Sequence, residues 1–487
     1  MGYKLSKTTV MKGVQCEKAL WLQTKKRHLA PPPDERTKAL FEEGKEIGKL
    51  AQNLYPNGVE IPFNTQPYSR KFDLTHQYIQ SGKKTIYEAT FQTQTMMCMV
   101  DILHRTDDGW QLIEVKSSRS QKEEHLYDIA IQFAILTSCG LPIKNAILIH
   151  INPDYIRSKT FEIPEFFTQI DVTEKIKPYL QEIRQKEPYF VKLSQQYKEP
   201  KQAIGPHCMK PYPCTFKDYC WQHIPERSVF DLIGLSYDER FELYYKGHVS
   251  FKELSHAPLN TATKRMVDAE NNVTTIIDKT ELKEFLSTLF YPMTFFDFET
   301  IFPTIPIYPK SYSRQQIPFQ YSAHIMNSPF DIPLHKEFLA TPTEDPRESL
   351  IKAMIRDIPK NSCVIVYNET FEKSVIAELI DAFPQYKHEL ESRFSEFRDL
   401  MIPFQKRFVY SHELQGRYSI KKVLPTFVPE LSYDELDIQE GLTASESFRK
   451  MADMDKPSEE KTRDALLEYC KLDTYAMIAL LNKLNTY

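Results

Sequence analysis

The sequence Met99-Val-Asp-Ile-Leu-His-Arg-Thr-Asp-Asp-Gly-Trp-Gln-Leu-Ile-Glu-Val-Lys-Ser117 has two apolar-rich runs on either side of an Asp-Asp-Gly segment. An Asp-Gly pair between such runs is typical of a tight turn, so we predict a β-hairpin. Side chains alternate along a strand, so Glu114 and Lys116 project from one side, which Asp101 on the partner strand can reach. Two carboxylates beside an ammonium group can support metal-assisted hydrolysis of a phosphodiester. The alternative is an edge hairpin with solvated charges.

Segments on both sides of the hairpin predict further parts of the same domain. Residues 85–91 have the composition of a strand, and residues 127–136 have the periodicity of a helix that carries Gln132. Residues 146–151 form an unbroken apolar run, which is typical of a buried strand. A helix is also predicted at residues 41–54. These helices and strands together indicate an α/β domain.

The spacing of Asp101, Glu114 and Lys116 resembles the PD-(D/E)XK nuclease superfamily, especially its RecB-like branch. Gln132 matches the glutamine that this branch carries on the following helix. The resemblance implies a restriction-endonuclease-like fold in which Asp101 and Glu114 bind Mg²⁺ or Mn²⁺. It also implies that Lys116 stabilises the charged transition state and that Gln132 belongs to the catalytic site.

Three cysteines, Cys208, Cys214 and Cys220, are spaced regularly, with five residues between neighbours. In a cytosolic chain such a cluster indicates metal binding rather than disulfides. It resembles the iron–sulfur RecB-like nucleases, including CRISPR-associated exonucleases, in which an N-terminal cysteine joins three that follow the catalytic core. Cys16 holds that N-terminal position. The resemblance implies a [4Fe–4S] cluster that ties the ends of the domain together. A tetrahedral zinc ion is an alternative, and unligated thiols in a loop are another.

The other four cysteines stand singly in apolar surroundings, and we predict that they are buried hydrophobic residues. They are Cys98, Cys139, Cys363 and Cys470. The cysteine at position 16 lies within residues 11–22, whose apolar periodicity predicts one short helix.

A second acidic segment is Met293-Thr-Phe-Phe-Asp-Phe-Glu-Thr300. Alternation places Asp297 and Glu299 on one face of the predicted strand and Phe296 and Phe298 on the other. Burying paired carboxylates in an apolar strand is costly unless a metal ion or a partner neutralises them. This segment is therefore a second candidate for a metal site.

Further acidic residues follow on predicted elements. Glu372 lies at the start of a helix that follows the predicted strand 363–368, and residues 463–477 predict a helix. On that last helix Tyr469 and Asp473 are four residues apart and therefore neighbours. Further strands are predicted at residues 318–324 and 335–340, and a helix at residues 345–358.

This half of the chain resembles the DnaQ-like (DEDD) exonucleases of the RNase H-like fold. Asp297 and Glu299 match the first motif, Glu372 stands at the aspartate of the second, and Tyr469 with Asp473 matches the tyrosine variant of the third. The resemblance implies that the four carboxylates hold two metal ions and that the tyrosine orients the attacking water. Asp399 falls where relatives carry a further acidic residue, and we expect it to support the fold or the site.

Composition limits the class of protein. The 487 residues, with 41% hydrophobic and 26% charged side chains, predict a globular protein of two or three domains. The net charge of −4 argues against a basic DNA-coating protein but not against a nuclease, whose acidic centres would hold cations. No apolar run reaches the roughly 20 residues of a membrane span, and no secretory signal is evident. We expect a cytoplasmic location without membrane partners.

We expect an α/β protein with three regions. Residues 1–224 form a RecB-like PD-(D/E)XK domain with the cysteine site, 225–290 a helical connector, and 291–487 a DnaQ-like domain. The leading hypothesis is a metal-dependent nuclease with two active sites on nucleic acid, preferably DNA, the C-terminal site acting as a 3′→5′ exonuclease in DNA repair or defence against foreign DNA.

Two other functions compete with this hypothesis. One is an RNA-processing exonuclease, and the other is a nucleic-acid-binding scaffold with one degenerate centre. Three departures from the family patterns favour the scaffold: Gly48 in place of a histidine, Leu136 in place of a tyrosine and Glu372 in place of an aspartate. The sequence does not fix the oligomeric state.

Overall fold

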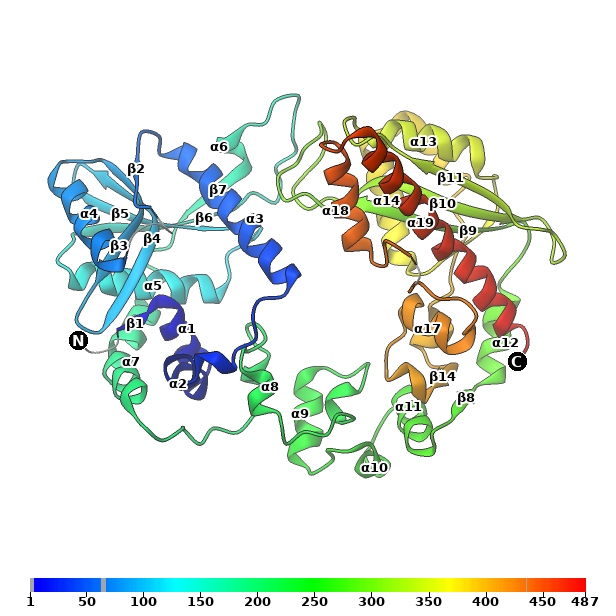
Figure 1. The fold of residues 1–487 in the computed structure, drawn as a ribbon, viewed down its shortest axis with the longest axis horizontal. Coiled ribbons are helices and arrows are strands. Elements are labelled where there is room, and N and C mark those ends of the chain that lie inside the picture. The colour runs from blue at the N-terminus through cyan, green and yellow to red at the C-terminus, as the bar shows by residue number, and fades with distance from the viewer. Residues whose placement is uncertain (1–3, 63–66, 435) are drawn as a thin grey trace. The chain divides into compact units, whose positions relative to one another are not determined.

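The computed structural model describes residues 4–62, 67–434 and 436–487. The chain divides into two compact units, Met1–Ile224 and Pro225–Tyr487, drawn from blue to green and from green to red in Figure 1. Each unit contains a mixed sheet covered by helices, so the protein is of the mixed α/β class. No helix of the described residues is long and apolar enough to cross a bilayer.

The N-terminal unit is built on a sheet with the strand order β2-β3-β4-β5-β6-β7, to which β1 is added beside β4. The pairs β2–β3, β5–β6 and β1–β4 are parallel, and the others are antiparallel. The strands are β1 (Leu5–Ser6), β2 (Val59–Glu60), β3 (Thr85–Gln92), β4 (Met96–Thr106), β5 (Gly109–Lys116), β6 (Ile143–Ile151) and β7 (Phe167–Asp171). The α-helices are α1 (Lys7–Gln15), α2 (Glu17–Lys25), α3 (Glu35–Ala51), α4 (Tyr68–Gln80), α5 (Glu123–Ser138), α6 (Ile163–Phe166), α7 (Lys177–Gln195) and α8 (Lys217–Cys220).

The predicted hairpin is confirmed as β4 and β5. Thr106 pairs with Gly109, so two aspartates form the turn. Gly109 has a φ of 156°, and a Cβ there would lie 2.6 Å from the Pro142 carbonyl oxygen, which explains the glycine. The apolar face of β4 packs on α5, whose Ile129, Ile131 and Ile135 side chains are fully buried. The hairpin is therefore central to the core of this unit.

The N-terminal segment differs from the prediction of one helix over residues 11–22. The helix is interrupted at Cys16, whose extended backbone (φ −163°, ψ 121°) separates α1 from α2. The Cys16 amide still donates to the Lys12 carbonyl oxygen at 2.8 Å, which closes α1. Apolar periodicity runs across both helices and contains no signal for this break.

The C-terminal unit is built on a sheet with the order β11-β10-β9-β12-β13, in which β9, β12 and β13 are parallel and β10 and β11 antiparallel to their neighbours. Its strands are β8 (Thr275–Ile277), β9 (Met293–Ile301), β10 (Ile317–Met326), β11 (Leu334–Leu339), β12 (Cys363–Val366), β13 (Phe397–Asp399) and β14 (Val409–Ser411). Its α-helices are α9 (Tyr237–Tyr245), α10 (Phe251–Leu254), α11 (Thr261–Asn272), α12 (Lys279–Ser287), α13 (Pro346–Asp357), α14 (Glu369–Ala382), α15 (Lys387–Glu391), α16 (Ile402–Gln405), α17 (Ile420–Phe427), α18 (Gly441–Met451) and α19 (Lys456–Leu484).

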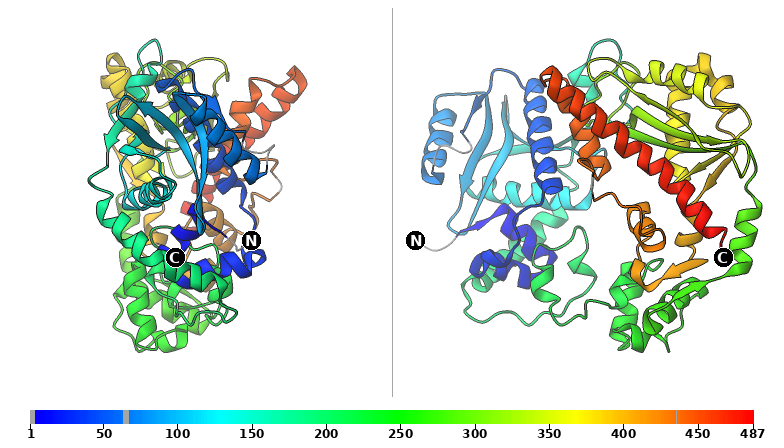
Figure 2. Two further views of the ribbon diagram at one scale, coloured as in Figure 1. Left: turned by 90° about the vertical axis from the view of Figure 1, so that its left-hand side faces the viewer. Right: turned by 45° about the vertical axis from the view of Figure 1, so that its right-hand side comes forward.

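The long helix α19 packs across β9 and β10, as Figure 1 and the right-hand view of Figure 2 show. The predicted alternation of β9 is confirmed: Phe296 and Phe298 join the core on the other face of the sheet, with α13 and α14. Residues 225–290, predicted as a helical connector, are mainly helical. They also form strand β8, which pairs with β14, and their apolar side chains belong to the core of this unit.

Candidate active centres and the cysteine pocket

The structure brings the four predicted residues of the hairpin site together. The backbone amide of Val115 donates to Asp101 Oδ2 at 2.7 Å, which holds that carboxylate beside the end of β5. Lys116 Nζ donates to Glu114 Oε1 and Gln132 Nε2 donates to Glu114 Oε2, both at 2.6 Å. Glu114 is thus held by a strand neighbour and by helix α5. We call this arrangement, with the residues added below, the first centre.

Three further charged residues belong to the first centre and were missed in the sequence. Asp128, one turn before Gln132 on α5, accepts from Lys116 Nζ at 2.6 Å and from Gln132 Nε2 at 3.0 Å. Lys7, at the start of α1, lies 2.9 Å from Asp128 Oδ1, and Glu88 on β3 interacts electrostatically with Asp101. The spacing of four between the helical aspartate and glutamine was a usable signal for the former. Lys7 carries no local signal, because it comes from a remote segment.

The first centre is crowded with negative charge. Burial and the neighbouring Glu114 raise the pKa of Asp101 to about 8, and burial raises the pKa of Glu88 to about 7. Burial also acts on Asp128, but Lys116 and Lys7 outweigh it and hold the pKa of Asp128 well below its usual range. When all groups are ionised, four carboxylates and two ammonium groups leave two negative charges, which a divalent cation would balance.

The amide of Gln132 carries a polar atom of the first centre that the described residues leave unsatisfied. The side chain is fully buried, and its Oε1 has no hydrogen-bond partner among the described residues. An unmet buried acceptor is costly unless water or a ligand group donates to it. A water molecule coordinated near Glu114 would supply such a donor.

The two departures from the RecB-like pattern lie outside these contacts. Leu136 is fully buried in the core formed by α5 and the sheet. Gly48 lies on α3, and a Cβ added to it would meet no atom within 4 Å. Neither position disturbs the contacts of Asp101, Glu114 or Lys116.

The four predicted cysteine ligands, Cys16, Cys208, Cys214 and Cys220, line one pocket with Ala19, Leu22 and Phe216, and we call it the cysteine pocket. Gln15 ties α1 to the loop that carries these cysteines: its Nε2 donates to the carbonyl oxygens of His207 at 2.8 Å and Tyr212 at 2.9 Å. Burial raises the pKa of Cys16 to about 11, so a bound metal would have to stabilise the thiolate.

The spacing of the sulfur atoms bears on which metal would fit. Within the described residues, no three of the four cysteine sulfurs lie within 4.8 Å of one another. Thiolates around a tetrahedral zinc ion, with Zn–S of about 2.3 Å, would be about 3.8 Å apart. In any three of these sulfurs at least one pair is therefore farther apart than the sulfurs of such a zinc site.

The remaining cysteines only partly follow the prediction. Cys98 and Cys363 are buried as expected. Cys139 is exposed, because it follows the last residue of α5 in the turn that leads to β6. Cys470 is fully buried as predicted, but its surroundings, described below, are acidic and not apolar.

The second centre contains Asp297, Glu299, Glu372, Tyr469 and Asp473. Strand β9 supplies the first two, the first turn of α14 supplies Glu372, and α19 supplies the last two. Asp297, Glu299, Tyr469 and Asp473 line a pocket of about 400 Å³. Glu372 is buried and does not line this pocket, but it is close enough to raise the pKa of Asp297.

Asp399 positions the start of α14. Its Oδ1 accepts from the backbone amides of Asn368 at 3.2 Å and Met401 at 2.9 Å, and its Oδ2 accepts from the Glu369 amide at 3.1 Å. The helix would otherwise begin without a side-chain cap, since Asn368 adopts a positive φ of 118°. Asp399 therefore holds the turn that presents Glu372.

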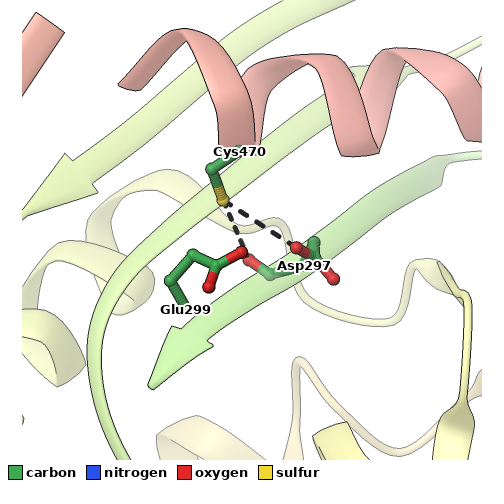
Figure 3. Close-up of side chains that lie close together, drawn as sticks. All are labelled: Asp297, Glu299 and Cys470. Carbon is green, nitrogen blue, oxygen red and sulfur yellow. Dashed lines mark hydrogen bonds between the residues drawn. The ribbon is translucent and has the colours of Figure 1, made fainter. Parts of the chain in front are cut away.

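Cys470 faces the acidic pair of β9. Its Sγ lies 3.9 Å from Asp297 Oδ2, and one ligand atom from each of Cys470, Asp297 and Glu299 lies within 4.8 Å of the other two. Figure 3 shows the three side chains pointing toward one another, the thiol from α19 and the carboxylates from β9. Such a group of ligand atoms could surround a cation.

The carboxylates of the second centre repel one another. Burial and the neighbouring Asp473, Glu299 and Glu372 raise the pKa of Asp297 well above its usual value. Burial raises the pKa of both Glu299 and Glu372 to about 8, with Asp473 adding to the effect on Glu299. Burial raises the pKa of Asp473 to about 6, a smaller shift because Tyr433 donates to it.

Two residues of the second centre were missed in the sequence. Tyr433 OH donates to Asp473 Oδ1 at 2.7 Å. Lys421, on α17, donates to the hydroxyl of Tyr469 at 2.8 Å and to the carbonyl oxygen of Gln439 at 2.6 Å. Both come from segments to which the sequence assigned no site, so no local pattern could have found them.

The fold and its sites define a mixed α/β protein with two buried acidic centres and a cysteine pocket. Residues 294–419, which include Asp297, Glu299 and Glu372, match the sequence model of a domain of unknown function, DUF2779. An uncharacterized protein of Ureaplasma parvum, UU173, is 31% identical over 212 residues, and the match covers 38% of this chain and 30% of that protein. A crystal structure of SSO0001 matches 43% of this chain and 96% of its own, with 16% identity and a TM-score of 0.16.

Proposed function

We propose that this protein is a metal-dependent nuclease with two active centres, a PD-(D/E)XK-like centre in the N-terminal unit and a DnaQ-like centre of the RNase H-like type in the C-terminal unit. The observation that carries the proposal is the gathering of three carboxylates from β9 and α19 on one pocket, with a fourth, Glu372 of α14, close enough to raise the pKa of Asp297. Among the described residues that line the pocket, Lys421 alone carries a positive charge. Four ionised carboxylates with one lysine leave three negative charges, so two divalent cations would give a net charge of about +1, which the scissile phosphate would balance.

In the second centre the side chains would hold Mg²⁺ or Mn²⁺ and place the substrate. Bound metal ions would activate a water molecule and neutralise the scissile phosphate. The Tyr469 hydroxyl, held by Lys421, lies in the same pocket and would orient that water. Glu372 Oε2 is buried without a hydrogen-bond partner among the described residues, as expected of a carboxylate that awaits a donor or cation. We assign 3′→5′ exonuclease activity to this centre.

In the first centre Asp101 and Glu114 would bind a divalent cation, and Lys116 would stabilise the charge that develops on the phosphate. The unmet Gln132 Oε1 would accept from a water molecule in the site. These contacts favour an active centre over a scaffold. Glu372, the longer acid in the second centre, still reaches the carboxylates of that pocket, so it does not single out a degenerate site.

The cysteine pocket would hold a [4Fe–4S] cluster, with zinc as the alternative. The four cysteines would ligate it and join α1 to the loop that follows α7, so its role is structural. We place the enzyme in the cytoplasm, with DNA as the preferred substrate and RNA as the alternative. DNA repair or defence against foreign DNA is the proposed setting.

The test of the second centre uses the full-length chain with Lys116→Ala, which silences the first centre. We expect Mg²⁺- or Mn²⁺-dependent shortening of a 5′-labelled single strand, stopped by a blocked 3′ end. Asp297→Asn should abolish this activity. Glu468→Gln, on an exposed residue beside Tyr469, is the control and should leave it unchanged.

Three results would contradict the assignment: shortening that ignores a 3′ block, shortening that persists in Asp297→Asn, or no metal-dependent shortening of any strand. Parallel DNA and RNA oligonucleotides of one sequence decide between the two substrate classes. Faster trimming of RNA would select the RNA-processing alternative.

A further inference from the structure

We propose that Lys7 is an exchangeable counter-ion of the first centre. In the metal-free protein the Lys7 ammonium group forms an ion pair with the Glu114 carboxylate, and it loses this ion pair when a divalent cation binds. This inference rests on the proposed function of the first centre as a metal site. Lys7 is a positioning residue that comes from outside the hairpin and α5. It keeps the carboxylates of the first centre in place before a metal ion binds.

The contacts of Lys7 place it in competition with a metal ion. Its Nζ lies 3.2 Å from Glu114 Oε1 and 2.9 Å from Asp128 Oδ1, and both carboxylates are largely or fully shielded from solvent. Glu114 Oε1 also accepts from Lys116, while Glu114 Oε2 accepts from Gln132. A carboxylate oxygen has two lone pairs, so Oε1 is saturated by the two lysines. A cation can bind that oxygen only after one ammonium group has left.

Lys7 is better placed to leave than Lys116. Lys116 lies two residues from Glu114 on β5, and its distances to Glu114 and Asp128 are both 2.6 Å. Lys7 belongs to another element and makes the longer contact with Glu114. It can lose this contact and still remain anchored on Asp128. Lys7 thus has an acidic partner in both states: Glu114 and Asp128 before the cation binds, and Asp128 afterwards.

The location of Lys7 in its helix supports a role in the centre. It is the first residue of α1, after the cap Ser6, whose Oγ accepts from the Thr9 amide at 3.2 Å. A cation at a helix N-terminus is unfavourable because the helix dipole is positive there. The carboxylates of the first centre offset this cost. Four ionised acids with Lys116 alone would carry three uncompensated negative charges without metal, and Lys7 reduces these to two.

The test measures Mn²⁺ binding directly, by electron paramagnetic resonance of the free ion, in the full-length chain. All variants carry Asp297→Asn and Asp473→Asn to remove ligands of the second centre. Asp101→Asn identifies the Mn²⁺ that belongs to the first centre. We expect Lys7→Gln to bind that Mn²⁺ more tightly, roughly tenfold, because a competing positive charge a few ångströms away is lost.

Two control variants separate exchange from general effects of charge or folding. Lys7→Arg keeps the charge and should bind Mn²⁺ with an affinity close to the parent. Lys4→Gln removes an equal charge three residues away, where Nζ contacts only Gln92 among the printed bonds, and should change little. In cleavage assays Lys7→Gln should need less Mn²⁺ for half-maximal rate than the parent.

The outcomes distinguish the two proposals. If Asp101→Asn removes a Mn²⁺ site but Lys7→Gln leaves its affinity unchanged or weaker, the counter-ion role is wrong and the metal centre stands. If no Mn²⁺ binding depends on Asp101, the metal centre itself is wrong, and the role of Lys7 falls with it. Tighter binding that Lys4→Gln reproduces would mean a long-range charge effect and would also overturn the specific exchange.

Discussion

Lys116 lies between two carboxylates and remains partly accessible. Its Nζ contacts Glu114 and Asp128, and 24% of the side chain is exposed. Burial lowers the pKa of this lysine, but Asp128 and Glu114 outweigh burial and raise it, so the ammonium form persists at any working pH. The residue therefore presents a permanent positive charge beside the proposed cation position.

We expect Lys116→Ala to lower DNA cleavage by the first centre by roughly 10²–10³-fold, because the lysine acts on charge that develops in the transition state. DNA affinity should change little. The measurement is single-turnover cleavage in a chain that already carries Asp297→Asn, with affinity measured in Ca²⁺. Lys144→Ala, on an exposed lysine of β6, is the control. Full cleavage by Lys116→Ala would reduce the first centre to a scaffold.

At the scale of elements, β9, α14 and α19 hold their acids together against repulsion. Glu299 and Glu372 have pKa values raised to about 8 from an ordinary value of 4.5. A carboxyl group with a raised folded-state pKa contributes stability below its ordinary pKa, and this contribution is lost as the pH rises through the folded-state pKa. The C-terminal unit without metal should therefore weaken between about pH 5 and pH 8.

We expect the free energy of unfolding in EDTA to fall by a few kcal/mol, on the order of the shifts, between pH 6 and pH 8.5. Saturating Mg²⁺ should remove most of the fall, because the carboxylates are then bound in the charged form. Urea unfolding followed by far-UV circular dichroism measures this. Glu299→Gln should flatten the dependence and Glu468→Gln should not. A metal-free protein that gains stability over this range would contradict the electrostatic account.

Patterns within single elements were enough to predict much of both centres. Alternation along β9 placed Asp297 and Glu299, and helical spacing on α19 placed Tyr469 with Asp473. The hairpin turn aligned Asp101 with Glu114 in the same way. Lys7 could not be found, because its contact with Glu114 joins residues 107 positions apart and depends on the tertiary fold.

The local course of the backbone was harder to predict from the sequence than the positions of the helices and strands. The extended residue at Cys16 breaks a run of helical periodicity at the point where Cys16 lines the cysteine pocket with residues near the end of the unit. The acidic surroundings of Cys470 likewise arise from the packing of α19 on β9. Both features require contacts between remote segments.

At the scale of the whole molecule, each unit has its own buried core. The tryptophans offer a selective probe, since Trp21, Trp110 and Trp221 all lie in the N-terminal unit and are buried. Trp21 packs beside the cysteine pocket with Phe216. Tryptophan fluorescence thus reports the unfolding of the unit that the cysteine pocket is proposed to tie together.

We expect anaerobically purified protein to absorb broadly near ~400 nm, as thiolate-bound iron–sulfur clusters do. Cys208→Ala should remove this absorption and lower the midpoint of unfolding detected by tryptophan fluorescence. The unfolding transition of the C-terminal unit, which contains no tryptophan, should keep its midpoint. Cys139→Ala, on an exposed cysteine, is the control. If the protein is colourless and contains stoichiometric zinc, the bound metal is zinc and not iron. An unchanged midpoint in Cys208→Ala would contradict the proposal that the cysteine pocket stabilises the N-terminal unit.

The cysteine pocket also has a consequence for the timing of biosynthesis. The ribosome makes Cys16 at the start of the chain and Cys208, Cys214 and Cys220 only after the whole sheet of the N-terminal unit. A nascent chain that has not reached Cys208 holds only one of the four thiols of the pocket. Loading of the proposed cluster would therefore be a late event, and the helices around Cys16 would reach their final environment only after the last segment of their unit has been made.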